Sequence, residues 1–284
     1  MPKKRRRISA FFKILIALTL SCGVLVAVGF YVMRSVQPID ISPPPPSEGC
    51  VATTEEDTNN LEVEQAANAS TVAGVAFSRT LPPQAVVIAY ATVWQESKFY
   101  NIRHGDRDSQ GLFQQRPSMA WGTPEQITDP VYSSAAFYDE LVTIDGYTDM
   151  PVHEAAQAVQ RSADGFAYDQ HEPRSQAMTN AFTGAEGPAV HCWFDTDNAV
   201  VTDVEGAATE MERVFGIRPD QLDKAKDRQT GEMGWAMAQW AVAHAHTYGL
   251  NSVSYADRRW TMASGAQGWG ESADPTPENE VVLG

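Results

Sequence analysis

The stretch WQESKFYNIRHGDRDSQGLFQQRPSMAWG, Trp94 to Gly122, decides the fold and the chemistry that we predict for this chain. It begins where an apolar helical run ends, because Pro82-Pro83 is a helix-start signal and residues 84–99 contain no glycine or proline. Glu96 therefore lies in or near the last helical turn, at the negative end of the helix dipole. The dipole and the aromatic neighbours both favour the protonated acid, so we predict a general acid that works near neutral pH.

The residues around this acid resemble those of a known family. Glu96-Ser97, followed fifteen residues on by Gly111-Leu112-Phe113-Gln114, is similar to the Glu-Ser…Gly-Leu-x-Gln signature of lysozyme-like soluble lytic transglycosylases. The similarity covers roughly residues 64–184 and looks like a branch found in membrane-anchored bacterial wall proteins. It implies a mainly helical lysozyme-like domain, a groove for peptidoglycan glycan strands, and Glu96 as the acid/base.

The resemblance also implies which side chains contact the sugar. In the family a serine and glutamines do so, which here are Ser97, Gln114 and Gln115, and we expect them to line one cleft with the acid. For Gln115 the alternative, that it faces solvent or caps a neighbouring helix, is equally open. A later Ala-Tyr-Asn-Ala-Gly-like stretch completes the family's groove. Its nearest counterpart is AVQRS at 158–162, which supplies Gln160 but lacks the tyrosine and the asparagine.

A second carboxylate would decide between two chemistries. Two-carboxylate glycosidases need an Asp or Glu across the scissile bond, and Asp106 and Asp108 follow the predicted acid helix. We favour the alternative that both form the turn and pair with Arg103 or Arg107. The resemblance implies a route with one glutamate, in which the N-acetyl group of the substrate assists and a sugar hydroxyl replaces water. Hydrolysis and formation of an anhydro-sugar end both stay open, and neither needs a cofactor.

A protein that binds glycan without cleaving it is the rival hypothesis. The stretch at 158–162 departs from the family's pattern, which keeps open a cell-wall glycan-binding or scaffold protein that retains a lysozyme-like groove. Both hypotheses predict the same partner, the glycan strand. They differ in whether Glu96 transfers a proton.

The N-terminal part predicts a membrane anchor. Residues 1–13 include a basic cluster, and residues 14–33 form an apolar run of about 30 Å as a helix, enough to cross a bilayer core. The basic cluster places the N-terminus inside, and the length of the run favours an uncleaved anchor over a signal peptide. Residues 34–60, with four consecutive prolines, are assigned to a linker. We therefore expect a single-pass protein of the cell membrane whose larger part is extracytoplasmic.

The charge balance narrows the partners. The chain has a formal net charge of −15 at pH 7, and all thirty-six Asp and Glu residues follow the predicted anchor. Such a surface repels polyanions, so the sequence argues against nucleic acid or anionic lipid as a partner. Solubility alone also explains the acidic composition.

Two cysteines follow the predicted anchor, Cys50 and Cys192. In an extracytoplasmic compartment an even pair predicts a disulfide, which here would bracket the lysozyme-like segment, 61–184. A zinc site needs more thiol or imidazole ligands at short spacing than His191 beside Cys192 provides, so we expect no metal.

The segment after residue 184 has a different character. Residues 184–188 mark a boundary, residues 189–272 mix short strand-like and helical stretches, and residues 273–284 are an acidic tail. The string GWAMAQWAVAHAHTYGLNSVSYADRRWT resembles a small C-terminal module of bacterial wall-associated proteins. The sequence as a whole therefore predicts an α+β fold: a transmembrane helix, a mainly helical lysozyme-like domain and a small α+β module.

Two pairs of residues in this module invite a binding role. His244 and His246 are two apart on a predicted helix and so point to different faces, which disfavours a shared metal. Trp260 and Trp269 either stack on sugar or close a core, and we favour the core.

Overall fold

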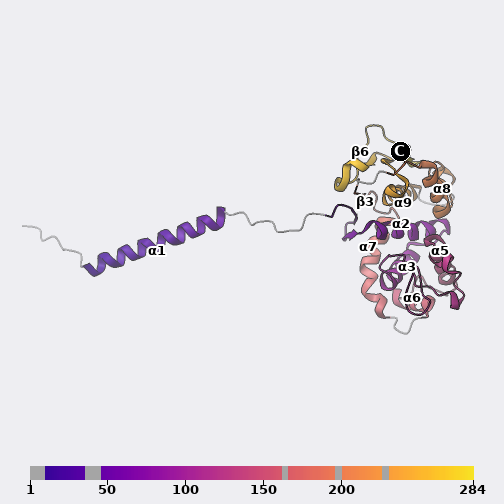
Figure 1. Ribbon diagram of the computed structural model, residues 1–284, viewed down its shortest axis with the longest axis horizontal. Coiled ribbons are helices and arrows are strands. Elements are labelled where there is room, and N and C mark those ends of the chain that lie inside the picture. Colours follow the sequence, from indigo (N-terminus) through magenta and orange to yellow (C-terminus); the bar gives the residue numbers. More distant parts are fainter. Residues whose placement is uncertain (1–9, 36–45, 162–165, 196–199, 226–229) are drawn as a thin grey trace, which may run out of the picture. The chain divides into compact units, whose positions relative to one another are not determined.

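The computed structural model describes residues 10–35, 46–161, 166–195, 200–225 and 230–284 (Figure 1). The chain divides into two compact units, residues 1–45 and 46–284. The first unit contains one long helix, α1 (Ala10–Ser35). A bilayer crossing needs about 20 consecutive, predominantly apolar residues, and no helix of the described residues has the required length and apolarity. This finding overturns the prediction of a transmembrane helix at 14–33.

The second unit, residues 46–284, combines helices with short strands. In chain order its first half consists of β1 (Gly49–Thr53), β2 (Thr58–Leu61), α2 (Val63–Ser78), α3 (Pro83–Glu96), η1 (Pro117–Met119), α4 (Pro124–Ile127), α5 (Pro130–Leu141), α6 (Val152–Gln160), η2 (Phe166–His171) and α7 (Glu172–Phe182). Its second half consists of β3 (Val190–Trp193), α8 (Val204–Phe215), η3 (Leu222–Lys224), α9 (Thr230–Ala243), α10 (Ala245–Tyr248), β4 (Ser252–Tyr255), β5 (Arg258–Thr261), η4 (Met262–Gln267), β6 (Gly270–Glu271) and β7 (Val282–Leu283).

The helices of this unit begin at the signals that the sequence provides. Helix α3 has a proline in its first turn and ends at Glu96, so the predicted place of the acid in the last turn is confirmed. Thr123 caps α4 through a capping box, and the Asp129 side chain accepts hydrogen bonds from the first backbone N–H groups of α5. These caps fix the starts of α4 and α5, which come after the loop that follows Glu96.

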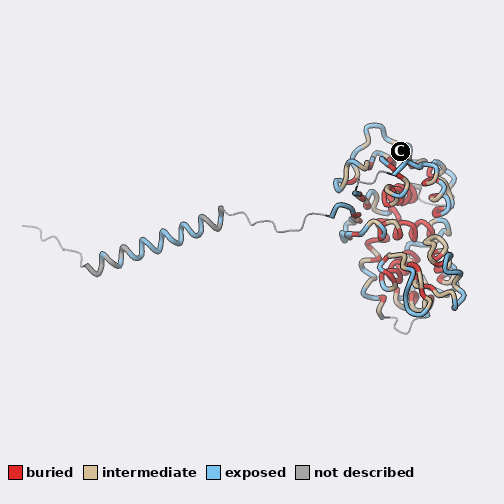
Figure 2. The backbone as a smooth tube through the Cα atoms, viewed as in Figure 1, coloured by how far each residue is buried: buried red, intermediate tan, exposed pale blue. Residues whose placement is uncertain are grey.

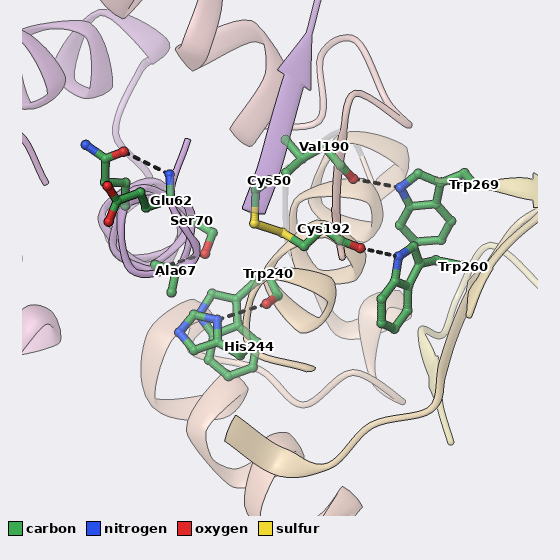
Figure 3. The surroundings of a disulfide bond; sticks show 11 residues. Cys50, Glu62, Ala67, Ser70, Val190, Cys192, Trp240, His244, Trp260 and Trp269 are labelled. Atoms are coloured by element: carbon green, nitrogen blue, oxygen red, sulfur yellow. Dashed lines mark hydrogen bonds between the residues drawn. A yellow bond between two sulfur atoms is a disulfide. The ribbon is translucent and has the colours of Figure 1, made fainter. Parts of the chain in front are cut away.

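A disulfide joins the start of this unit to a strand far along the chain. Within the described residues the strands form two sheets, ordered β2-β1-β3 and β6-β5-β4-β7. Cys50 of β1 lies directly opposite Cys192 of β3 in antiparallel register, and the two form the predicted disulfide with a Cα–Cα distance of 4.0 Å (Figure 3). A closed loop of this size removes about 5 kcal/mol of unfolded-state entropy in the chain-entropy model.

Helix α2 lies at the centre of the unit, between helices α3, α5 and α6 on one side and helices α8 and α9 on the other (Figure 1). Most of its residues are buried, as Figure 2 shows along its length. Gly74 lets α8 approach closely, because an added Cβ would lie 2.3 Å from a methyl carbon of Val214. Buried residues on both sides of the predicted boundary at 184–188 belong to one hydrophobic cluster.

Three aromatic side chains from three helices bond to α2. The Tyr90 hydroxyl of α3 donates to the Ala69 carbonyl at 2.7 Å, and the Tyr138 hydroxyl of α5 donates to the Val72 carbonyl at 3.1 Å. The Trp240 indole N–H of α9 donates to the Thr71 hydroxyl at 3.1 Å. These buried hydrogen bonds fix how each helix sits on α2, since a buried donor without a partner costs about 1–3 kcal/mol.

The first strands extend the folded unit into the predicted linker. In the segment 34–60, which is predicted to be a linker, residues 49–53 form β1 and residues 58–60 belong to β2. Their alternation explains this: Cys50 and Ala52 are buried on either side of the partly buried Val51, and Asn59 and Leu61 are buried while Thr58 and Asn60 are exposed.

Candidate functional site

Glu96 is the last residue of α3 and is partly buried. Its Oε1 accepts a hydrogen bond from the Tyr168 hydroxyl at 2.8 Å, and its side chain also hydrogen-bonds to Gln160. Desolvation by burial is the largest influence and raises the pKa of Glu96, while these two hydrogen bonds to the carboxylate lower the pKa and offset part of that rise. The outcome is a carboxyl group that holds its proton more firmly than an exposed glutamate does.

Gln160 connects this carboxyl group to an open groove. The amide of Gln160, the last residue of α6, donates to the Phe113 carbonyl at 2.7 Å. Gln160 also lines a groove of about 610 Å³, together with Gln114 of the loop that follows the acid. The carboxyl of Glu96 is thus one side chain away from the groove wall.

The groove wall combines aromatic and charged side chains. Trp121 and Tyr132 line it, and their flat faces suit the apolar faces of a sugar ring. Its two carboxylates pair with arginines: Glu140 with Arg161 at 2.8 Å, and Asp139 with Arg79. The groove therefore offers hydrogen bonds and ring faces rather than a single strong charge.

The three polar residues expected in one cleft with Glu96 are in different environments. Gln114 lines the groove, whereas Glu96 is not among the residues that line it. Ser97 is 7% exposed and its hydroxyl donates to the Leu112 carbonyl at 2.7 Å, so it ties the following loop to the end of α3. Gln115 is 2% exposed, and its amide donates to the Ser133 carbonyl at 3.0 Å. Ser97 and Gln115 thus shape the loop that carries Gln114.

Neither of the two aspartates considered as a second carboxylate lines the groove. Asp106 is largely exposed and lies 3.9 Å from Arg107. Asp108 accepts hydrogen bonds from Arg116 at 2.7 Å and from the backbone and hydroxyl of Ser118. The Arg116 guanidinium is the main cause that holds the pKa of Asp108 well below its usual value. Asp108 therefore serves as a turn former, paired with Arg116 rather than with the arginines that the sequence analysis named.

Tyr168 is the site residue that the sequence analysis missed. Within the stretch 158–162, Val159, Gln160 and Arg161 line the groove; Arg161 also pairs with Glu140, and residue 162 lies outside the described residues. The tyrosine that contacts the acid comes from η2 instead. A signal for it exists in Ala167-Tyr168-Asp169, which differs from Ala-Tyr-Asn in one amide group.

The candidate ligand residues of the C-terminal part are engaged in packing. His244 stacks on Trp240, and burial lowers its pKa to about 4 (Figure 3). His246 stacks instead on Phe194. His191 hydrogen-bonds to the Ala266 carbonyl. Across the described ranges, no group of three or more His, Cys, Asp or Glu side chains is placed to hold a metal ion.

The two tryptophans near the disulfide close the core around it. Trp260 is fully buried and its indole N–H donates to the Cys192 carbonyl at 3.0 Å, whereas Trp269 is partly buried and donates to the Val190 carbonyl at 2.7 Å (Figure 3). Both bonds anchor β3, so the structure supports the core assignment of Trp260 and gives Trp269 a structural bond.

We compared the sequence with known protein families and with curated proteins. No protein-family model and no curated protein matches the sequence.

Proposed function

We propose that this protein cleaves the glycan strands of peptidoglycan, with Glu96 as its acid/base. The observation that carries the proposal is a desolvated glutamate at a helix end, held by Tyr168 and Gln160 beside an open groove. A raised pKa favours the protonated carboxyl group, which is the form that general acid catalysis of glycoside cleavage needs. The sequence signature around Glu96 and the ring faces of the groove agree with a polysaccharide substrate.

The chemistry follows from one carboxyl group. Protonated Glu96 donates its proton to the glycosidic oxygen while the bond from the anomeric carbon to that oxygen breaks. The resulting carboxylate then takes a proton from the attacking hydroxyl group, which belongs to the sugar itself in a lytic transglycosylase or to water in a lysozyme. The groove carboxylates Asp139 and Glu140 each pair with arginine. Among the described residues this favours the route with a single glutamate and therefore an anhydro-sugar product.

The disulfide supports a location outside the cytoplasm, where peptidoglycan lies. Disulfides persist in oxidising compartments and are rare in the cytosol, and the Cys50–Cys192 bond is buried. The proposal therefore places the groove on the same side of the membrane as its polymer.

A digestion of purified peptidoglycan tests the proposal. The full chain should release soluble muropeptides, and mass spectrometry should show anhydro ends, while Glu96→Gln releases none above the background of the buffer. Asp108→Asn serves as the matched carboxylate control and should retain cleavage. Sedimentation of the protein with the polymer, without any released product, would instead favour the glycan-binding protein and overturn the enzyme.

A further inference from the structure

The two hydrogen-bond partners of Glu96 come from two neighbouring elements. Gln160 is the last residue of α6, and Tyr168 lies in the middle of η2, which follows in the chain. Helix α6 and η2 pack against each other, and both pack against α3, which carries Glu96. The polar surroundings of the acid therefore depend on how α6 and η2 are held together.

One side chain of α6 makes two contacts with η2. His153, in the first turn of α6, places its Nδ1 2.6 Å from Oδ1 of Asp169, the residue after Tyr168. The His153 ring also stacks on Phe166, the first residue of η2, with ring centroids 5.0 Å apart and an angle of 27° between the planes. The imidazole thus holds η2 on both sides of Tyr168.

We propose that His153 is a positioning residue, which fixes η2 on α6 so that Tyr168 and Gln160 reach the Glu96 carboxyl group together. The contact with Asp169 is partly shielded, since the His153 side chain is 17% exposed. A shielded pair contributes more to structure than the exposed pairs of the surface, whose typical worth is about 0–1 kcal/mol. The catalytic meaning of this role rests on the proposed function, whereas the geometry does not.

The contact does not depend on one protonation state of His153. Neutral imidazole can carry its proton on Nδ1 and donate it to the Asp169 carboxylate, and imidazolium donates from both nitrogens. The role of His153 is therefore to hold a geometry rather than to transfer a proton. Its effect should reach Glu96 through the Tyr168 hydroxyl, which is part of a side chain only 1% exposed.

Loss of His153 should change a property of Glu96 that a general loss of stability would not change. Both hydrogen bonds to Glu96 lower its pKa, so loosening them leaves desolvation less opposed and the pKa rises further. An increase of up to about one pH unit, which is tenfold in the acid dissociation constant, corresponds to one hydrogen bond to a charged group. If Glu96 is the acid, the alkaline limb of the pH profile of kcat/KM should shift to higher pH by the same number of pH units.

The experiment follows the Glu96 carboxyl carbon directly. The full chain is labelled with carboxyl-13C glutamate, and the Glu96 signal is assigned by its absence in Glu96→Gln. His153→Ala should raise the titration midpoint of Glu96 and lower peptidoglycan cleavage several-fold. His153→Gln, whose side-chain amide can still donate to Asp169, should bring both values back toward those of the wild type. In a Tyr168→Phe background the effect of His153→Ala should shrink, since the two residues act through one bond.

The controls separate this inference from the proposed function. Glu205→Gln on α8 removes an ion pair with Arg218, which follows that helix, and should leave the Glu96 titration unchanged. If His153→Ala does not fold, Asp169→Ala removes the same contact from its more exposed side and should give the same rise. A folded variant with an unaltered Glu96 midpoint would overturn the inference, even if cleavage falls. A wild-type protein without cleavage would overturn the proposed function and leave the titration result valid.

Discussion

The end of α3 and the loop that follows it each hold a carboxylate, and the two carboxylates are in opposite environments. Glu96 is partly buried and is held by the neutral side chains of Tyr168 and Gln160, so desolvation dominates and its pKa rises. Asp108 is partly exposed, with 37% of its side chain accessible, and is bound by the Arg116 guanidinium and by Ser118, so its pKa falls. The number of hydrogen bonds does not separate the two, because both accept several.

The difference teaches that the charge of the donor and the access of water decide the role of an acid. A neutral hydroxyl or amide orients a carboxyl group without forcing it to ionise, whereas a guanidinium keeps it ionised. Asp108 therefore stays ionised and holds the loop that includes Arg116, a residue of the groove wall. At Glu96 desolvation favours the protonated carboxyl group, which can act as a proton donor.

The largest expected difference between the two carboxylates is in catalysis. Glu96→Gln should lower peptidoglycan cleavage by about 10²–10⁴-fold, the usual contribution of a general acid. Asp108→Asn should cost less than about tenfold, because it only loosens the loop at Arg116. Rates of muropeptide release from both purified variants measure this. Equal losses would mean that both carboxylates take part in the reaction and that the role assigned to Asp108 is wrong.

The neighbouring glutamines should separate binding from folding in the same loop. Gln115→Ala leaves the buried Ser133 carbonyl without its partner and should lower the free energy of unfolding by about 1–3 kcal/mol. Gln114→Ala should leave that stability nearly unchanged and raise KM for soluble glycan fragments by roughly 2–10-fold. Urea unfolding and steady-state kinetics measure the two effects. The reverse pattern would place Gln115, and not Gln114, at the substrate.

Tyr168→Phe tests how far a neutral donor matters to Glu96. Without the hydroxyl the carboxylate loses one of its two hydrogen bonds, so the pKa of Glu96 should rise by less than about one unit. The alkaline limb of the pH profile of kcat/KM should then shift to higher pH. A downward shift would mean that Tyr168 donates mainly to the protonated acid.

The smallest effect expected is on thermal stability, and its sign should differ between the two carboxylates. Because the folded pKa of Glu96 is raised, the folded protein is penalised once this group ionises, so Glu96→Gln should raise Tm at pH 7, with the gain fading below about 4.5. Because the folded pKa of Asp108 is lowered, ionised Asp108 stabilises the fold above pH 3.8, its ordinary pKa, and this stabilisation is lost as the pH falls further. Asp108→Asn should therefore lower Tm at pH 7 and matter progressively less under more acidic conditions. Calorimetry across this pH range would show two shifts of the same sign if the comparison were wrong.

Local signals predicted the parts of this structure that depend on local sequence. The proline start of α3, the placement of Glu96 in its last turn and the capping Thr123 follow from residues within one or two turns. The Cys50–Cys192 pairing followed from the two cysteines that lie after residue 33, on the expectation of an oxidising compartment. In contrast, hydropathy over residues 14–33 predicted a membrane crossing that the described helices do not provide.

The parts that escaped prediction depend on contacts between distant segments. Tyr168 reaches Glu96 across seventy-two positions of the chain, and Gln115 is buried because Ser133, eighteen positions on, accepts its amide. No spacing rule distinguishes Gln114 from Gln115, since neighbouring residues in an irregular loop point wherever the loop turns. Only the path of the loop, set in part by Ser97 and Leu112, decides which one reaches the groove.

The central position of α2 makes the folded unit cooperative. Tyr90, Tyr138 and Trp240 anchor three helices to α2 within one turn of each other, and the backbone of β3 is bound by Gln239 of α9. A cut between residues 61–184 and the C-terminal part would expose one face of α2, and its apolar side chains would then contact water. Residues 46–284 should therefore melt in a single transition, and a substitution at Trp240 should lower the population of competent Glu96 although the two side chains belong to different helices. The conformation of Glu96 therefore depends on the C-terminal part, because α3 and that part pack on the same central helix.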